Sequence, residues 1–295
     1  MLSRRHLMIV AGSAALTLTH RAHAAEDKPF GGSELPKSIA AIEAKSRGRL
    51  GVAVLDTGSG QRFAHRGDER FPMCSTFKFL LAAAVLARVD KGRERLDRAL
   101  PIRPEDVQSY GPVTKALVGR EATIAQLCDA AVTVSDNGAA NLLLNTLGGP
   151  EGLTRFAREI GDDITRLDRM EPELNEAKVG DPRDTTTPNA MLADLDRIVL
   201  GSVLAAPSRE RLTGWLVAAR TGDARIRAGL PQGWRAGDKT GTGENGTAND
   251  IAVLWPPKGA PLLVTSYLTT SPLKPAGRDA IHAAVARAIV AAMKV

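Results

Sequence analysis

Histidine is scarce in this chain of 295 residues, which contains five. Three of them, His6, His20 and His23, lie within the first 24 residues, so only His65 and His282 remain beyond that point. We expect those two to be surface residues without a role. The sequence therefore argues against a Ser-His-Asp triad and against a histidine-rich zinc site. We expect neither a metal nor a cofactor.

Cysteine is rarer still, with two residues in the chain. Cys74 and Cys128 are far apart in the sequence and form no CxxC motif. They could pair in an oxidising compartment, but two buried free thiols are the preferred interpretation.

Long apolar runs and a large charge excess are also missing. The chain has 39 Lys and Arg against 33 Asp and Glu, a net charge of +6, and Arg4, Arg5 and Arg21 lie in the first 24 residues. The small excess that remains argues against a nucleic-acid partner. No segment after residue 24 is apolar and long enough to anchor the chain in a membrane.

The first 24 residues resemble an export signal. Arg4 and Arg5 precede an apolar stretch over residues 7–18, and Ala22-His23-Ala24 offers a small-x-small cleavage site. This pattern is typical of a secretory signal peptide over residues 1–24. The arginine pair resembles a twin-arginine signal, and an ordinary Sec signal is the alternative. We expect a periplasmic, monomeric mature protein.

The periodicity of apolar residues predicts a mixed α+β fold. Strand patterns occupy residues 50–56, 61–65, 235–242, 247–255 and 262–269, and helical patterns occupy 38–46, most of 75–215, and 278–293. This order predicts a five-stranded antiparallel sheet flanked by terminal helices, with an all-helical domain inserted and the active site between them. The expected domains are 25–68 with 217–295, and 69–216.

A serine and a lysine three residues apart form the first chemical motif, Ser75-Thr76-Phe77-Lys78. On a helix the two side chains share a face. A lysine beside a serine can accept its proton if burial lowers the pKa of the amine. The same spacing recurs at Ser271 and Lys274, but the neighbouring prolines indicate a structural segment there.

Two further motifs follow in order. Ser135-Asp136-Asn137 combines a hydroxyl and an amide that could pass a proton and hold an amide substrate; the alternative is a polar turn. The segment 239–243, Lys-Thr-Gly-Thr-Gly, places a lysine beside two hydroxyls and suits an anionic acyl substrate. Its alternative is an edge strand whose lysine discourages aggregation.

Together these motifs resemble the class A serine β-lactamases, for which S-x-x-K, S-D-N and K-T-G are signatures shared with penicillin-binding proteins. The segment 166–175, Arg-Leu-Asp-Arg-Met-Glu-Pro-Glu-Leu-Asn, resembles the Ω-loop of that family, here about residues 166–184. The resemblance covers essentially the whole chain after the leader. It implies hydrolysis of the β-lactam amide of penicillins and cephalosporins, and hence antibiotic resistance.

The resemblance also implies roles for five catalytic residues. Ser75 attacks the lactam carbonyl and passes its proton to Lys78 or, through a water, to Glu171. Backbone N–H groups of Ser75 and residue 242 hold the oxyanion. Ser135, helped by Lys239, protonates the departing nitrogen. Glu171 activates the water that releases the product; the alternative is a surface acid in an acidic loop.

The remaining residues bind substrate under the same resemblance. The implied substrate-binding residues are Tyr110, Asn137, Asn175, Arg225, Thr240, Gly241 and Thr242. Arg225 stands in for the arginine that many relatives carry where this chain has Ala248; its alternative is a solvated arginine in a basic stretch. Neither disulfide common in relatives can form, because Gly243 and Ala82 occupy the partner positions of Cys74 and Cys128.

Relatives also imply an ion pair between Arg169 and Asp184 that closes the neck of the loop. Two rival functions share the short motifs: a D-Ala-D-Ala peptidase or transpeptidase, and a penicillin-sensing binding module. Glu171 discriminates against the first, since a peptidase lacks a carboxylate that activates water. The sensor needs a membrane anchor, and the chain has only a cleavable leader.

Overall fold

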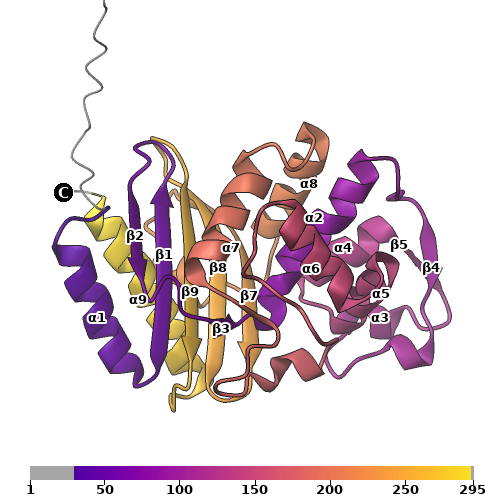
Figure 1. Ribbon diagram of the computed structural model, residues 1–295, viewed down its shortest axis with the longest axis horizontal. Helices are drawn as coiled ribbons and strands as arrows, with labels where there is room; N and C mark the ends of the chain where they lie inside the picture. The colour runs from indigo at the N-terminus through magenta and orange to yellow at the C-terminus, as the bar shows by residue number, and fades with distance from the viewer. Residues whose placement is uncertain (1–29, 294–295) are drawn as a thin grey trace, which may run out of the picture.

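The computed structural model describes residues 30–293 (Figure 1). The predicted signal peptide over residues 1–24 therefore lies outside the described residues. None of the helices within 30–293 combines the length and the apolar character that crossing a bilayer requires.

A five-stranded antiparallel sheet forms one half of the molecule, in the order β2-β1-β9-β8-β7. The strands are β1 (Arg49–Asp56), β2 (Arg62–His65), β7 (Arg235–Gly243), β8 (Thr247–Trp255) and β9 (Leu262–Thr269). Each predicted strand is confirmed with ends shifted by at most one residue. The side chains of β1, β8 and β9 are buried almost continuously, as expected for a sheet that is covered on both faces. The predicted fold class is confirmed.

Alternate residues of the strands pack into two different cores. Val52 and Val54 contact the cluster that contains the terminal helices, whereas Ala53 and Leu55 belong to the cluster of the helical half. The terminal helices α1 (Glu34–Ser46) and α9 (Pro275–Ala292) cover the first face, side by side in Figure 1. Both begin a few residues earlier than the sequence predicts.

The chain between β2 and β7 is mainly helical and lies against the other face of the sheet (Figure 1). Its helices are α2 (Phe77–Asp90), α3 (Pro112–Ala116), α4 (Ile124–Thr133), α5 (Asn137–Leu147), α6 (Pro150–Glu159), α7 (Pro188–Leu195) and α8 (Ala206–Val217). Two short two-stranded sheets interrupt it: β3 (Phe71–Pro72) with β6 (Thr185–Thr186), and β4 (Ala99–Pro101) with β5 (Glu121–Thr123).

Helix α2 is the central element of the helical half. Every residue from Phe77 to Ala87 is buried, as expected for a helix that is apolar on all sides. It contacts α4, α5, α6 and α8, and the turn that precedes it, Cys74–Thr76, packs against β7 and β8.

The two cysteines are buried and free, as predicted. Burial raises the pKa of the Cys74 and Cys128 thiols far above that of an exposed cysteine. Both side chains therefore act as small apolar groups in the core.

His282 is not the surface residue that the sequence suggests. It is fully buried on α9, where Nδ1 lies 2.8 Å from Ser266 Oγ and Nε2 lies 3.0 Å from the Ala248 carbonyl oxygen. Because the carbonyl can only accept, Nε2 carries the proton and Nδ1 accepts from the serine. His65 is half-buried and contacts Glu43 at 2.8 Å, so it too has a structural partner.

This buried imidazole predicts a specific pH dependence of stability. Burial lowers the pKa of His282 from 6.5 to about 3. Between those values the unfolded chain binds a proton and the folded protein does not, so stability falls as the pH falls through this window. We expect His282→Gln to lose less unfolding free energy than the wild type between about pH 7 and about pH 4, by on the order of 3 kcal/mol. Denaturant titrations measure this; parallel losses in both proteins would contradict it.

Candidate active site

The nucleophile turn joins the sheet to α2. Ser75 lies in a 3₁₀ turn, η1 (Cys74–Thr76), immediately before that helix. Asn249 on β8 fixes the turn, because its Nδ2 donates to the carbonyl oxygens of Pro72 (2.8 Å) and Met73 (3.1 Å). Gly241 on β7 permits close contact, since a Cβ there would lie 2.6 Å from the Met73 oxygen. The strand and the turn therefore meet backbone to backbone.

Lys78 lies one helical turn beyond Ser75, and the predicted shared face is confirmed. Its Nζ is 3.0 Å from Ser75 Oγ, 2.9 Å from the Ser135 carbonyl oxygen and 2.6 Å from Asn137 Oδ1. The side chain is fully buried, and this burial lowers the pKa of Lys78 while the nearby Glu171 opposes the shift. The amine is thus closer to proton-acceptor character than an exposed lysine.

Glu171 reaches the same serine from the opposite side. Its Oε1 accepts from Ser75 Oγ at 3.1 Å and lies 2.9 Å from Lys78 Nζ, and its side chain is completely buried. The alternative of a surface acid is therefore wrong. The predicted convergence of a hydroxyl before α2 and a carboxylate from the mid-chain loop on one crevice is confirmed.

Two asparagines position this carboxylate. Asn175 lies in a 3₁₀ turn, η3 (Glu173–Glu176), and its Nδ2 donates to Glu171 Oε2. Asn141 on α5 brackets the backbone of Glu171, accepting from its N–H at 3.0 Å and donating to its carbonyl at 2.8 Å. The four-residue spacing of Asn137 and Asn141 puts both on one face of α5. That spacing is the signal by which the sequence could have indicated Asn141.

A second lysine and a second serine face the first pair. Lys239 Nζ donates to Ser135 Oγ at 3.0 Å, and Lys239 is fully buried. Burial, with the positive charge of Lys78 as the next contribution, holds the pKa of Lys239 well below its usual range. β7 is indeed an edge strand, but its lysine points into the protein, so the solvent-exposed alternative is wrong.

The segment 135–137 forms the junction between α4 and α5. Ser135 has a left-handed backbone, with φ at 60°. Asp136 caps α5 through the N–H of Ala139 (2.9 Å) and also accepts from the N–H groups of Val113 and Thr114. The buried carboxylate thereby fixes the first turn of α3, a function that the sequence did not reveal. A simple polar turn is therefore the wrong interpretation.

These groups open into a pocket of about 350 Å³ between the two halves of the molecule. Its lining consists of Ser75, Tyr110, Ser135, Asn137, Asn175, Thr221, Arg225, Thr240 and Thr242. Lys78, Glu171 and Lys239 are buried behind this wall. Thr221 is an addition to the predicted residues; its Oγ1 lies 2.6 Å from Thr240 Oγ1.

Arg225 is buried at the pocket wall, so it is not a solvated arginine. Its guanidinium donates to Asp279 (2.7 Å), to the carbonyl oxygens of Gly241 (2.8 Å) and Asn249 (2.7 Å), and to Thr242 Oγ1 (2.7 Å). Gly241 thus contributes its carbonyl to hold the arginine. The guanidinium lies beside the hydroxyl that faces the pocket.

The predicted ion pair at the neck of the loop is confirmed. Arg169 Nε donates to Asp184 Oδ2 at 2.6 Å, and Asp184 also accepts from the N–H groups of Asp168 (2.8 Å) and Arg169 (2.9 Å). One buried carboxylate therefore ties together the two ends of the loop that carries Glu171.

Cutting this pair is expected to loosen the loop. We predict that Arg169→Ala lowers the free energy of unfolding by about 1–3 kcal/mol, because Asp184 stays buried without its guanidinium. Hydrogen exchange over residues 166–184 should accelerate. Arg183→Ala is the matched control, since Arg183 pairs with Asp181 at the exposed surface. Equal exchange in the two variants would contradict the assignment.

The site and the fold define an acyl-transfer enzyme with a serine nucleophile, since a buried serine contacts both a lysine and a carboxylate inside a pocket. The model of the β-lactamase enzyme family matches residues 34–293. β-Lactamase L2 of Stenotrophomonas maltophilia is 48% identical, over 97% of this chain and 98% of that relative. β-Lactamase CTX-M-8 of Citrobacter amalonaticus is 46% identical over 87% of this chain and 88% of its own length.

Solved structures agree with these relatives. An ancestral β-lactamase of class A, GNCA, has a TM-score of 0.87 and 62% identity, covering 88% of this chain and 99% of its own. The chain therefore belongs to the class A serine β-lactamases.

Proposed function

We propose that this protein hydrolyses the β-lactam amide of penicillins and cephalosporins through an acyl-enzyme on Ser75, and so confers antibiotic resistance. The observation that carries the proposal is the placement of one hydroxyl, Ser75 Oγ, within hydrogen-bonding distance of both Lys78 Nζ (3.0 Å) and Glu171 Oε1 (3.1 Å). A nucleophile that must first lose a proton and later be released by water needs a proton acceptor for each step.

In acylation, Ser75 Oγ attacks the lactam carbonyl carbon. Its proton has two acceptors in reach, the Lys78 amine and the Glu171 carboxylate, which also contact each other at 2.9 Å. Because Lys78 and Glu171 contact each other, they can exchange the proton taken from Ser75. Both routes therefore leave the two side chains with the same total charge. The oxyanion is held by the backbone N–H groups of Ser75 and Thr242, which belong to the turn and the strand that pack together here.

The departing ring nitrogen takes its proton from Ser135. The Ser135 hydroxyl lies 3.3 Å from Lys78 Nζ and 3.0 Å from Lys239 Nζ. A proton lost to the nitrogen can therefore be replaced from a neighbouring amine. The lowered pKa of Lys239 favours that transfer.

Substrate is bound around the rim of the pocket. Asn137 binds the side-chain amide, Thr240 and Thr242 bind the carboxylate, and Tyr110, half-exposed, forms one wall. Gly241 adds no side chain and keeps the strand close to the nucleophile. Arg225 supplies positive charge behind Thr242.

Deacylation needs a water between the ester and Glu171. The Asn175 amide, which contacts Glu171 Oε2, shares in orienting that water. The water gives its proton to Glu171 as it attacks the ester carbonyl, and the proton then returns to Ser75 Oγ. A carboxylate that can activate this water favours a hydrolase over a D-Ala-D-Ala peptidase and over a penicillin sensor. Both of those retain the acyl group that a penicillin leaves on the serine.

Replacement of Arg225 should mainly weaken the binding of carboxylate-bearing substrates. We expect Arg225→Ala to lower kcat/KM by roughly tenfold to a hundredfold, chiefly through KM, because a charge-assisted contact is lost. Arg220→Ala is the control, since Arg220 is exposed in the same basic stretch. Steady-state kinetics with a penicillin measure both; an unchanged kcat/KM for Arg225→Ala would contradict the role.

We also propose that the protein is exported. The leader over residues 1–24 directs the chain to the periplasm, through the twin-arginine route indicated by Arg4 and Arg5, and the mature protein acts there as a monomer without a membrane anchor. A periplasmic form that begins at Ala25 would support the cleavage site; retention of Met1 would contradict it.

A nitrocefin turnover assay tests the function itself. A hydrolase converts many equivalents of substrate at a steady rate. A single burst of one equivalent, followed by a stable adduct, would identify a peptidase or a sensor instead.

A further inference from the structure

A second cavity, of about 720 Å³, lies apart from the catalytic pocket and shares none of its lining residues. It is formed by the C-terminal end of α2, the following segment as far as Asp106, and α5. Five arginines line it together with two acidic residues, Glu94 and Asp106. The arginines are Arg88, Arg93, Arg95, Arg98 and Arg103.

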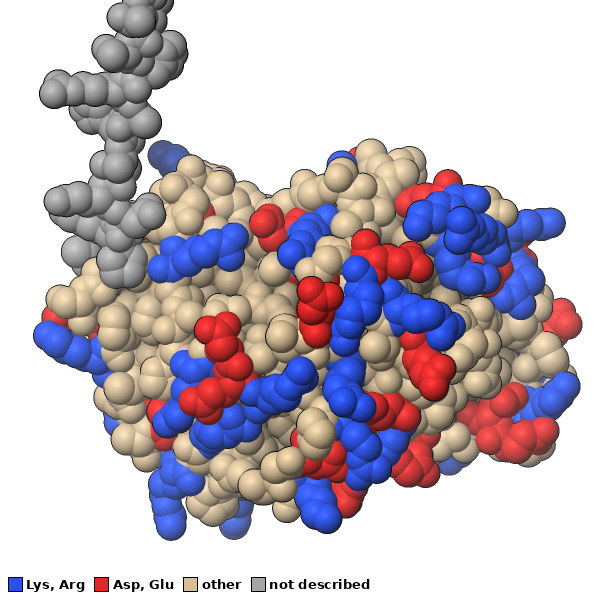
Figure 2. All heavy atoms as spheres, in the orientation of Figure 1, with Lys and Arg blue, Asp and Glu red and all other residues tan. Residues whose placement is uncertain are grey.

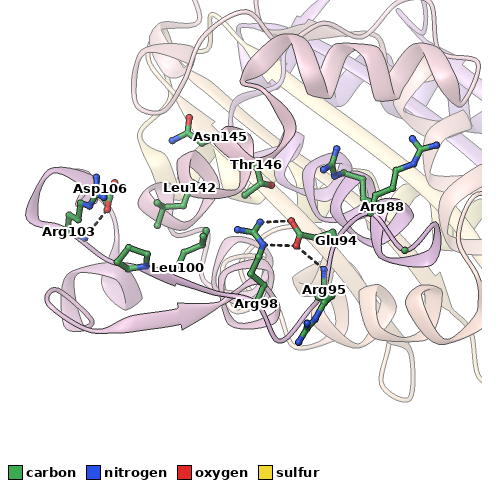
Figure 3. A pocket seen from close by; sticks show the side chains of 13 residues that line it. Arg88, Glu94, Arg95, Arg98, Leu100, Arg103, Asp106, Leu142, Asn145 and Thr146 are labelled. Atoms are coloured by element: carbon green, nitrogen blue, oxygen red, sulfur yellow. Dashed lines mark hydrogen bonds and ion pairs between the residues drawn. The ribbon is translucent and has the colours of Figure 1, made fainter.

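The acidic residues near the cavity already have hydrogen-bond partners within the protein. Glu94 is buried and takes a bidentate pair from Arg98, at 2.8 and 2.5 Å (Figure 3). Arg95 pairs with Asp97 in the same way, at 3.0 and 2.8 Å. Asp106 accepts from the backbone N–H of Arg103 at 2.8 Å, not from its guanidinium. These contacts leave a surplus of positive charge at the cavity.

Three guanidinium groups carry that surplus. Within residues 30–293, Arg88, Arg93 and Arg103 make no ion pair. The Nε of Arg88 is buried and has no hydrogen-bond partner among those residues. A buried donor without a partner costs free energy unless something else accepts from it. Figure 2 shows Lys and Arg side chains gathered over the end of the molecule where α2 ends.

The rest of the lining suits an organic anion. In Figure 3 the Arg88 side chain lies to one side of the Arg98–Glu94 pair, and Leu100 and Leu142 lie to the other. Asn145 and Thr146 from α5 add an amide and a hydroxyl. The cavity thus combines a cationic side, neutral hydrogen-bonding groups and an apolar wall, at a volume typical of small-molecule sites.

We propose that this cavity binds an extended, multiply charged phosphate, held by Arg88 and its neighbour Arg93 at one end and by Arg103 at the other (Figure 3). The planar guanidinium fork matches phosphate oxygens bidentately, and two or more phosphate charges balance arginines that come from separate segments. The ligand is either a soluble polyphosphate ester or an anionic lipid headgroup. Leu100 and Leu142 contact its organic part.

Such a ligand would contact α2 and α5, two helices that also position residues of the catalytic site. Ser75 and Lys78 lie at the N-terminal end of α2, and Asn137 begins α5, whereas the cavity contacts the opposite end of each helix. The binding site is therefore distinct from the catalytic pocket but shares its supporting elements.

Isothermal titration of the whole protein with pyrophosphate and with tripolyphosphate at low salt tests the site. We expect saturable binding at one site, weakened by on the order of tenfold or more in Arg88→Gln/Arg93→Gln, because each variant removes charge-assisted hydrogen bonds. Arg93→Gln/Arg103→Gln, at two exposed positions, should weaken it similarly. Unchanged nitrocefin turnover shows that each variant is folded.

The matched control is Arg62→Gln/Arg287→Gln, which removes two exposed arginines at the opposite end of the molecule. Unchanged affinity in the control supports the cavity. Equal weakening in the control, or no saturable heat with either probe, overturns the proposal. Sedimentation with vesicles of phosphatidylcholine and cardiolipin, whose headgroup carries two phosphates, would assign the ligand to a lipid if it is lost in Arg88→Gln/Arg93→Gln. Binding of the soluble probes alone would assign it to a soluble ester.

Discussion

The Glu171→Gln variant is expected to accumulate a covalent penicilloyl adduct on Ser75. Glutamine keeps the shape of the side chain but cannot take a proton from the attacking water. Deacylation should slow by on the order of a thousandfold, the usual contribution of a positioned general base. Acylation continues through Lys78, which contacts Ser75 Oγ independently of Glu171. The adduct therefore forms faster than it is released.

Mass spectrometry of the intact protein, quenched at intervals after mixing with benzylpenicillin, measures this. Glu173→Gln is the matched control, since Glu173 is an exposed acid two residues away in the same loop. The control should return to the unmodified mass as fast as the wild type. Rapid return of Glu171→Gln to the unmodified mass would refute the role of Glu171 in deacylation.

The Ser75→Ala variant is expected to lose both acylation and hydrolysis. Without Oγ no covalent intermediate can form, and turnover should fall by at least about 10⁴-fold, as for other serine nucleophiles. Fold stability should change little, because Ser75 contributes only its hydroxyl contacts to Lys78 and Glu171.

Ser271→Ala is the control for this loss. Ser271 has the same spacing to a lysine, but its Oγ donates to the Ser46 carbonyl at 2.6 Å, so it is structural as predicted. Nitrocefin turnover should therefore survive in Ser271→Ala. An adduct with penicillin in Ser75→Ala would show that another group is the nucleophile.

Strand and helix positions could be predicted because local periodicity records burial directly. Strand-forming residues between turn segments indicated the bounds of β8 and β9 without error, and apolar residues at helical spacing indicated α9. The position of His282 carried the same kind of signal: with Val285, Ala286 and Ile289 it lies at helical spacing on the buried face of α9. The prediction that His282 is exposed followed from the usual exposure of histidine and not from this spacing, and it was wrong.

The site could be predicted only in part from local chemistry. Three-residue spacing places Ser75 beside Lys78, but the contact of Ser75 with Glu171 spans 96 residues, and no periodicity encodes it. Only the resemblance to a family suggested that contact. Asn249, Thr221 and Asp279 act through partners that the tertiary fold brings together, so no local pattern in the sequence indicates their contacts.

A crystal structure of Glu171→Gln soaked with a penicillin tests most directly whether Ser75 and Glu171 act on the same acyl group. We expect continuous density from Ser75 Oγ to the opened ligand, with the substituted amide at position 171 facing the ester carbonyl across a single water. Density joined to any other side chain, or an ester carbonyl remote from position 171, would contradict it.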